Sequence, residues 1–282
     1  MIGKTYLMMT SRIKKNRYLI LRRTLQIGLL VLFAGANWWG WKFVLGNYSS
    51  AYVLESFYLT DPHAVLQTFA AGFVISTDAV IGAVIVLAFY ALIAGRSFCS
   101  WVCPVNLITD LAFWAREKWH ISKKENILRF GRNTRYWVLG LGFVLSAIIG
   151  VAAFEVINPI TILHRGIIFG FGIGWTYVAG VFLFDLLVSE YGWCGHLCPL
   201  GAMYAGISRF SLIKVKHDVD KCTLCMICKD VCHEKQVLDI IGHHSGFIKG
   251  ECSNCGRCIE VCDDNALKYS IYIIKIGGYN NE

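Results

Sequence analysis

Charged residues are scarce in this chain: Asp, Glu, Lys and Arg make up 16% of its 282 residues, against about 25% in soluble domains. Proline is also rare, at 4 residues, whereas hydrophobic residues reach 56%. This composition argues against a soluble enzyme and favours a membrane protein. The net charge of +8 does not indicate nucleic-acid binding, because the basic residues flank apolar runs as they do at membrane surfaces.

Four apolar stretches are long enough to cross a bilayer, which takes about 17–25 residues. They are residues 24–41, 79–95, 136–154 and 166–184. The fourth is the least regular, because Asp185 and Glu190 follow it closely, and a buried or re-entrant segment is the alternative there. The sequence therefore predicts an all-α, multi-pass membrane domain of four transmembrane helices, arranged as two hairpins.

Lysine and arginine are concentrated on one side of these stretches. The segment up to Arg23 has seven basic residues and no acidic ones, and the loop 96–135 has eight basic and three acidic. The loop 42–78 has one basic and three acidic residues. The positive-inside rule then places both termini and the middle loop in the cytoplasm, with the protein in the inner membrane. Ala34-Gly35-Ala36 also resembles a signal-peptide cleavage site, but the following tryptophans favour an uncleaved helix with an interfacial aromatic belt.

Eight of the twelve cysteines form two C-x2-C-x2-C-x3-C runs near the C-terminus. This repeated spacing is typical of bacterial ferredoxins with two 4Fe–4S clusters, in which the fourth cysteine of each run binds the other cluster. A zinc site rarely uses such a run, and almost never twice. We therefore predict a small α+β two-cluster ferredoxin-like domain over residues 214–282, after a membrane domain over residues 1–213. The expected ligands are Cys222, Cys225, Cys228 and Cys262 for cluster one, and Cys252, Cys255, Cys258 and Cys232 for cluster two.

The other four cysteines form two Cys-x3-Cys-Pro motifs, Cys99 to Cys103 and Cys194 to Cys198. Each motif follows the second span of a hairpin, which indicates an internal duplication. Because proline disfavours helix at the residue before it, each motif predicts a break between a span and an interfacial helix, the first of which covers residues 105–120. The four cysteines are either small buried side chains at helix breaks or a further shared redox or metal site.

Four spans, twin Cys-x3-Cys-Pro motifs and a two-cluster tail resemble the NapH family, membrane quinol dehydrogenase subunits associated with periplasmic nitrate reductase. The resemblance covers nearly the whole chain, including residues 158–166 and 193–200. It implies oxidation of menaquinol or ubiquinol, with electrons passing to a NapG-type Fe–S protein and c-type cytochromes. It leaves the terminal acceptor open.

Two other interpretations compete with this one. FixG/RdxA-type assembly or metal-reduction factors for a membrane oxidase share the twin motifs and ferredoxin core, but they carry a large additional C-terminal domain. A thiol-based redox sensor is the third. No C-x-x-C-H haem motif occurs in the sequence to carry electrons across the bilayer.

Ionisable residues near the membrane are candidates for proton transfer. Asp185 at the end of the fourth span is a catalytic candidate, with a structural hydrogen bond or an ion pair to Arg96 as the alternative. On the opposite side, the candidate acceptors of a quinol proton are Asp61, His63, Asp78, Glu155, His164 and Arg165, of which the two histidines are the catalytic candidates.

Overall fold

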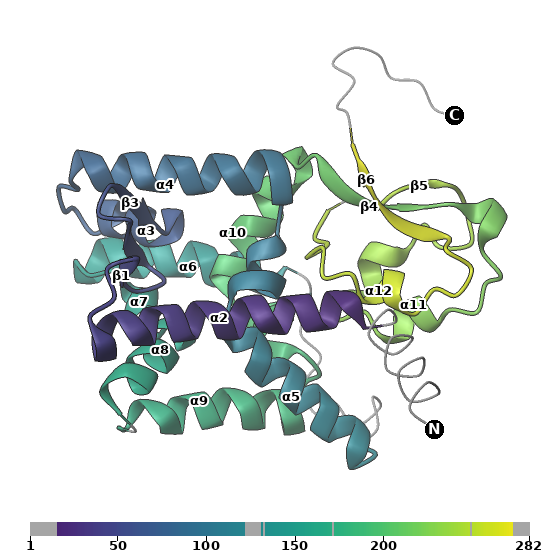
Figure 1. The fold of residues 1–282 in the computed structure, drawn as a ribbon, viewed down its shortest axis with the longest axis horizontal. Helices are drawn as coiled ribbons and strands as arrows, with labels where there is room; N and C mark the ends of the chain where they lie inside the picture. Colours follow the sequence, from purple (N-terminus) through teal and green to yellow (C-terminus); the bar gives the residue numbers. More distant parts are fainter. Residues whose placement is uncertain (1–15, 122–130, 132, 171, 249, 273–282) are drawn as a thin grey trace. The chain divides into compact units, whose positions relative to one another are not determined.

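The computed structural model describes residues 16–121, 131, 133–170, 172–248 and 250–272 (Figure 1). The chain divides into two compact units. The helical unit comprises residues 21–88 and 99–203, and the cysteine-rich unit comprises residues 1–20, 89–98 and 204–282. The ten residues 89–98, which precede the first Cys-x3-Cys-Pro motif, thus belong with the C-terminal part of the chain. The domain boundary between residues 213 and 214 stays a prediction.

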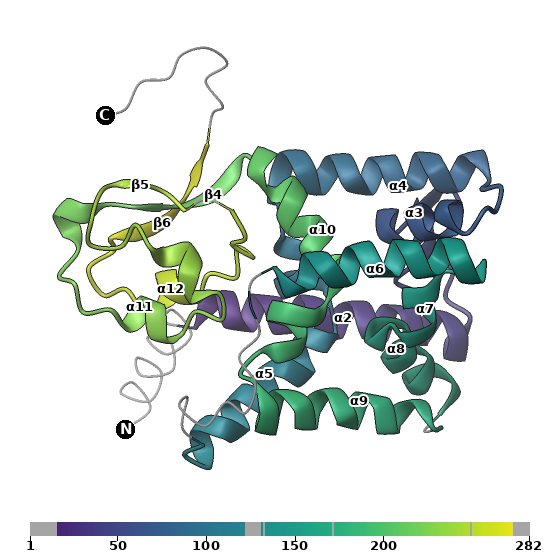
Figure 2. The same cartoon turned by 180° about the vertical axis from the view of Figure 1, so that it is seen from behind.

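Four apolar helices share a common direction in the helical unit, as Figures 1 and 2 both show. They are α2 (Arg17–Trp39), α4 (Thr77–Phe89), α6 (Thr134–Ile149) and α9 (Gly174–Leu183). Among the described residues, α2 is the one helix that is both long and apolar enough to cross a membrane. The remaining apolar helices are shorter: Thr77–Ile93, Thr134–Ile149, Pro159–Phe169 and Gly174–Val188. The structure therefore supports the four expected spans only in part.

The fourth expected span, residues 166–184, is not one continuous helix. Helix α8 (Pro159–Phe169) ends at Gly170, whose φ of 95° lies outside the range of helical residues. Helix α9 begins after this break and runs on as a π-helix, η4 (Phe184–Val188). Hydropathy alone places the start of this span too early, because a glycine turn interrupts the apolar run without adding any polar residue.

A cap of short helices and strands closes one end of the helical unit (Figure 1). It contains α3 (Pro62–Ala70), α7 (Ala153–Ile157), α8 and an antiparallel sheet of β1 (Val44–Gly46), β2 (Ser50–Val53) and β3 (Phe57–Thr60) in that order. The prediction that residues 1–213 are all-α is therefore wrong for residues 44–60. Asp61 and Asn158 cap α3 and α8 by accepting a hydrogen bond from a backbone N–H two residues later, and each is followed by a proline at the first helical position.

The Cys-x3-Cys-Pro motifs lie at breaks between helices, as predicted. The α4 helix continues as a π-helix, η1 (Tyr90–Ala94), and a second π-helix, η2 (Phe98–Val102), carries the first motif. In the second half, η4 and η5 (Trp193–Leu197) repeat this order. Each motif is followed by an α-helix, α5 (Val105–Lys118) or α10 (Pro199–Ile207), and α5 confirms the helix expected over residues 105–120. Short π-helices of this kind are frequent at functional sites.

The cysteine-rich unit is built on a small antiparallel sheet of order β5-β4-β6. Its strands are β4 (Ile213–His217), β5 (Gly246–Phe247) and β6 (Leu267–Ile271), and its two short α-helices are α11 (Ile227–Asp230) and α12 (Arg257–Glu260). Single 3-10 turns connect these elements: η6 (Ser208–Phe210), η7 (Val219–Lys221) and η8 (Lys235–Leu238). Cys228 and Cys258 belong to its buried core beside Val215, Leu238 and Leu267. Because cysteines fill much of so small a core, its stability depends on what the thiols bind.

Candidate metal centres

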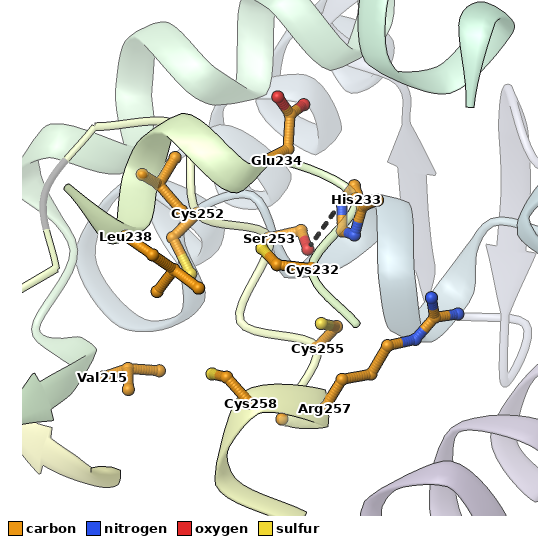
Figure 3. Close-up of a pocket in the computed structure, with 12 residues that line it drawn as sticks. Val215, Cys232, His233, Glu234, Leu238, Cys252, Ser253, Cys255, Arg257 and Cys258 are labelled. Carbon is orange, nitrogen blue, oxygen red and sulfur yellow. Dashed lines mark hydrogen bonds between the residues drawn. The ribbon is translucent and has the colours of Figure 1, made fainter. Parts of the chain in front are cut away.

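The eight cysteines of the two C-terminal runs line two separate pockets. One is lined by Cys222, Cys225 and Cys228 together with Cys262. The other is lined by Cys252, Cys255 and Cys258 together with Cys232, and Figure 3 shows these four side chains around one space. Each pocket thus takes three cysteines from one run and the fourth from the other run, which is the arrangement that the spacing predicts for two 4Fe–4S clusters.

The backbone of both cysteine loops is curled by residues in the left-handed region. Leu224 and Met226 each have a φ of 60°, and at the corresponding positions Asn254 has 50° and Gly256 has 78°. Left-handed backbone costs about 1–2 kcal/mol at a residue other than glycine. Turns that alternate in this way bring backbone N–H groups into a concavity that binds anions, including iron–sulfur clusters. The loops therefore have the form that a cluster with thiolate ligands requires.

The chemistry of the four thiols in the second pocket also fits a metal cluster. Burial, and next the neighbouring Cys255, raise the pKa of Cys252 to about 12, while Arg96 opposes this rise. Burial likewise raises the pKa of Cys232 and of Cys258, with further contributions from the neighbouring thiols. Four buried thiolates are stable together only when cationic groups or metal ions offset their charge, and the iron ions of a cluster do so.

A buried ion pair stabilises the loops around this second pocket. Arg96 donates to the Glu234 carboxylate at 2.5 Å and to the Glu251 backbone carbonyl at 3.1 Å. The side chains of Arg96 and Glu234 are 1% and 3% exposed. Glu234 follows Cys232 by two residues and Glu251 directly precedes Cys252, so Arg96 fixes the backbone beside two of the four cysteines of this pocket. The alternative pairing of Arg96 with Asp185 is wrong, because the structure pairs Arg96 with Glu234.

The four cysteines of the twin motifs come together in the helical unit. Burial raises the pKa of Cys103 well above its ordinary value, and the neighbouring Cys99 and Cys198 raise it further. Burial, and next the neighbouring Cys103, also raise the pKa of Cys194 well above its ordinary value. No disulfide joins any of the cysteines in the described part of the chain. The duplication thus brings two motifs far apart in the sequence into one group of thiols, in which Cys103 is buried and the other three are partly buried.

Two buried polar side chains from other helices hold the backbone of these motifs. Gln26 on α2 donates to the carbonyl groups of Ser100 at 3.0 Å and Cys103 at 3.2 Å. Arg135 at the start of α6 donates to the Gly195 carbonyl at 3.3 Å, and both side chains are fully buried. Sequence reasoning missed both residues. A lone Gln within an apolar stretch is the signal that points to Gln26, since an unpaired amide there would be costly.

Asp185 lies in η4 and holds the segment that leads to the second motif. Its carboxylate accepts a hydrogen bond from the Trp193 backbone N–H at 2.8 Å. Arg116 donates to the backbone carbonyls of Asp185 at 3.3 Å and Leu186 at 2.9 Å. This geometry favours the structural hydrogen bond for Asp185, and a role in proton transfer stays a prediction.

At the capped end of the helical unit, three of the candidate proton acceptors meet. The ligand atoms of Asp61, His63 and Glu155 lie within 4.8 Å of one another. Burial, and next Glu155, raise the pKa of Asp61 to about 7, and burial lowers the pKa of His63 to about 4. His164 is outside this group and lies against Phe33 and Tyr48; burial, and next Arg165, lower its pKa to about 4. Asp78 does not belong to the group, and Arg165 acts on His164.

Known proteins resemble this chain over most of its length. The family model described as a 4Fe-4S binding domain matches residues 75–122 and 167–217, once over each Cys-x3-Cys-Pro motif. Ferredoxin-type protein NapH of Escherichia coli (strain K12) is 41% identical over 90% of this chain and 89% of its own length. NapH of Haemophilus influenzae is 40% identical, with 90% of each chain covered. The methylamine utilization ferredoxin-type protein MauN of Methylorubrum extorquens is 39% identical over 92% of this chain and 91% of its own. No solved structure matches the chain.

Proposed function

Because the chain belongs to the NapH family of ferredoxin-type proteins, we propose that it oxidises quinol in the membrane and passes the electrons on through 4Fe–4S clusters. Its relatives and the matching family model make it an iron–sulfur electron-transfer protein. The observation that carries the proposal is the pair of pockets, each lined by four cysteines drawn from both C-terminal runs.

The exposed faces of the helical unit support its place in a membrane. On α4, Val84 is 57% exposed, and on α6, Ile148 is 75% exposed, and other large apolar side chains accompany them along both helices. Soluble proteins rarely leave continuous apolar faces in water. We propose that lipid covers these faces and that both termini lie in the cytoplasm. A reporter fused after Ser50 is then expected outside, and reporters after Lys124 and Glu282 inside; an external C-terminus would reverse the assignment.

The chain's own residues bind and tune the redox groups. When bound, 4Fe–4S clusters accept and release single electrons, whereas a quinol gives up two electrons and two protons. The eight cysteine thiolates of the cysteine-rich unit hold two such groups, and Arg96 sets the charge beside Cys252. His63, His164 and Asp185 are alternative candidates for acceptors of the quinol protons, and of these the contacts of Asp185 favour a structural role.

The proposed electron acceptors are a NapG-type Fe–S protein and c-type cytochromes, leading to periplasmic nitrate reductase. One of the relatives of nearly equal identity is a methylamine utilization protein. A chain so similar to both groups fits a common electron-donating role, in which the partner proteins set the terminal acceptor. Menaquinol and ubiquinol are both compatible substrates.

We further propose that Cys99, Cys103, Cys194 and Cys198 hold a third metal centre, shared by the two halves of the duplication. The proximity of the four thiols and the double match to a 4Fe-4S binding domain support it. Two clusters contain eight irons and a third of the same type brings the total to twelve. In anaerobically purified protein, Cys103→Ser is expected to lower the iron content by about a third and to leave the C-terminal clusters intact. A wild-type content of eight irons with no other metal in stoichiometric amount excludes the shared centre.

The main test is the reduction of the clusters by quinol in proteoliposomes, followed by visible absorption and electron paramagnetic resonance. Quinol is expected to reduce the wild-type clusters, which an assembly factor or thiol sensor has no need to do. Cys225→Ser and Cys262→Ser are expected to remove the same cluster, although they lie in different runs. If Cys262→Ser instead removes the same cluster as Cys255→Ser, the crossed assignment of ligands is wrong. Clusters that stay oxidised with every quinol tried would refute the proposed dehydrogenase function.

A further inference from the structure

Two carboxylates and an imidazole meet at the capped end of the helical unit, although they come from distant parts of the sequence. Asp61 and His63 lie where β3 ends and α3 begins, and Glu155 lies in α7. Their ligand atoms are within 4.8 Å of one another. This group lies outside the cysteine sites and belongs to the helical unit alone.

Neutral groups orient both carboxylates. Asp61 accepts the backbone N–H of His63 at 3.2 Å. Glu155 accepts hydrogen bonds from the hydroxyl groups of Ser49 at 2.8 Å and Thr161 at 3.4 Å, and from the Asn158 side-chain amide at 3.0 Å. Within the part of the chain that the structure describes, no Lys or Arg forms an ion pair with either acid. Two adjacent carboxylates without a cation repel each other and favour the binding of a proton or a metal ion.

The imidazole of His63 favours a bound metal ion over a bound proton. Its side chain is 1% exposed, and neither ring nitrogen has a hydrogen-bond partner among the described residues. The ring packs against Phe143 and Phe154, with centroids at 5.7 Å and 5.4 Å. A buried imidazole without hydrogen bonds costs free energy, and a protonated one would be expected to pair directly with a neighbouring carboxylate. Binding a metal ion through one ring nitrogen gives that nitrogen a partner and neutralises both acids together.

We propose that Asp61, His63 and Glu155 bind one divalent transition-metal ion, for which Zn²⁺ is the best fit. Ligand atoms bound at about 2.1 Å in tetrahedral geometry lie about 3.4 Å apart, which the observed group reaches with small side-chain movements. A nitrogen ligand favours Zn²⁺ over Mg²⁺ or Ca²⁺, which prefer oxygen. Three protein ligands leave a fourth position for water or another small ligand. The bound ion joins the β3–α3 junction of the first half to α7 of the second half.

The test uses the full chain in detergent with its clusters intact. After dialysis against a chelator, Zn²⁺ is titrated in competition with a chromophoric chelator, and X-ray absorption at the zinc edge identifies the ligands. We expect one zinc per chain with nitrogen and oxygen ligands at about 2.0–2.1 Å, and no sulfur at about 2.3 Å. Sulfur ligands would place the zinc on cysteines instead and would overturn the proposal.

Matched variants assign the site to its three residues. His63→Gln and Glu155→Gln are each expected to weaken zinc binding at least tenfold, while His164→Gln and Asp78→Asn, a buried imidazole and a carboxylate outside the group, bind zinc like the wild type. Unchanged cluster absorption and melting show that each variant is folded. Equal zinc affinity in His63→Gln and the wild type refutes the site. A wild-type chain that binds no zinc also refutes the site, and a loss of quinol-dependent reduction in both variants then identifies the group as a proton acceptor.

Discussion

Replacing Arg96 by methionine removes the cation from a fully buried ion pair and leaves the apolar part of the side chain in place. The Glu234 carboxylate then keeps its hydrogen bond from Gln236 but loses its ion pair with Arg96. Removing one partner of a buried ion pair costs about 3–5 kcal/mol. In a unit of this size, that loss lowers the melting midpoint by more than about 10 °C.

The effect is expected first at the pocket that contains Cys232 and Cys252, because Glu234 and Glu251 flank these two ligands. Anaerobic melting followed by visible absorption reports the loss of clusters, and electron paramagnetic resonance shows which cluster is lost. The double variant Arg96→Met/Glu234→Leu removes both charges and is expected to recover more than half of the stability.

The exposed ion pair between Lys221 and Asp218 provides the control. Its side chains are 55% and 30% exposed, and exposed ion pairs contribute little to stability because water and salt screen them. Lys221→Met is therefore expected to shift the midpoint by a few degrees at most. If Arg96→Met behaves like Lys221→Met, or if both clusters are lost together, the ion pair does not stabilise the second pocket as we infer.

Two further substitutions test local features of the sites. Gly256→Ala is expected to destabilise the pocket with Cys252, because a Cβ there would lie 2.7 Å from the Tyr18 ring and the residue has a φ of +78°; Gly28→Ala, with nothing within 4 Å, is the control in the same melting assay. Asp185→Asn keeps an oxygen that can accept the Trp193 N–H, so this variant is expected to retain quinol-dependent reduction. Asp185→Leu removes that acceptor and is expected to lose both the structure of the second motif and quinol-dependent reduction. Loss of quinol-dependent reduction in Asp185→Asn without structural change points to proton transfer instead.

The spacing of the cysteines along the chain explains why their grouping in two pockets could be predicted. Three cysteines of each pocket lie within seven residues, and the fourth, from the other run, follows from the pattern itself. The helix break at each Cys-x3-Cys-Pro motif follows from proline in the same way. These features depend on a few neighbouring residues, so no tertiary information is needed to infer them.

The missed features depend on long-range contacts or on very short elements. The strands of residues 44–60 are three or four residues long, which is too short for a clear alternation of polar and apolar residues. The pairing of Arg96 with Glu234 joins positions 138 residues apart. Glu155 is likewise far along the chain from Asp61 and His63; the sequence indicated each of the three separately, and the fold brings them together.

The two halves of the duplication are alike at the end with the cysteine motifs and differ at the capped end. Both keep a Cys-x3-Cys-Pro motif in a π-helical segment, and both keep an acidic or amide cap followed by proline, Asp61-Pro62 or Asn158-Pro159. After the proline, however, the first half has His63 where the second has Ile160. A site that the two halves share symmetrically needs the same ligands from each half, and the motif cysteines provide two from each. A site with a single imidazole needs different ligands from the two halves, and the group of Asp61, His63 and Glu155 is of this kind. On the two proposals made above, the duplicated scaffold provides one symmetric thiol site and, at its capped end, one asymmetric site for a nitrogen- and oxygen-bound ion.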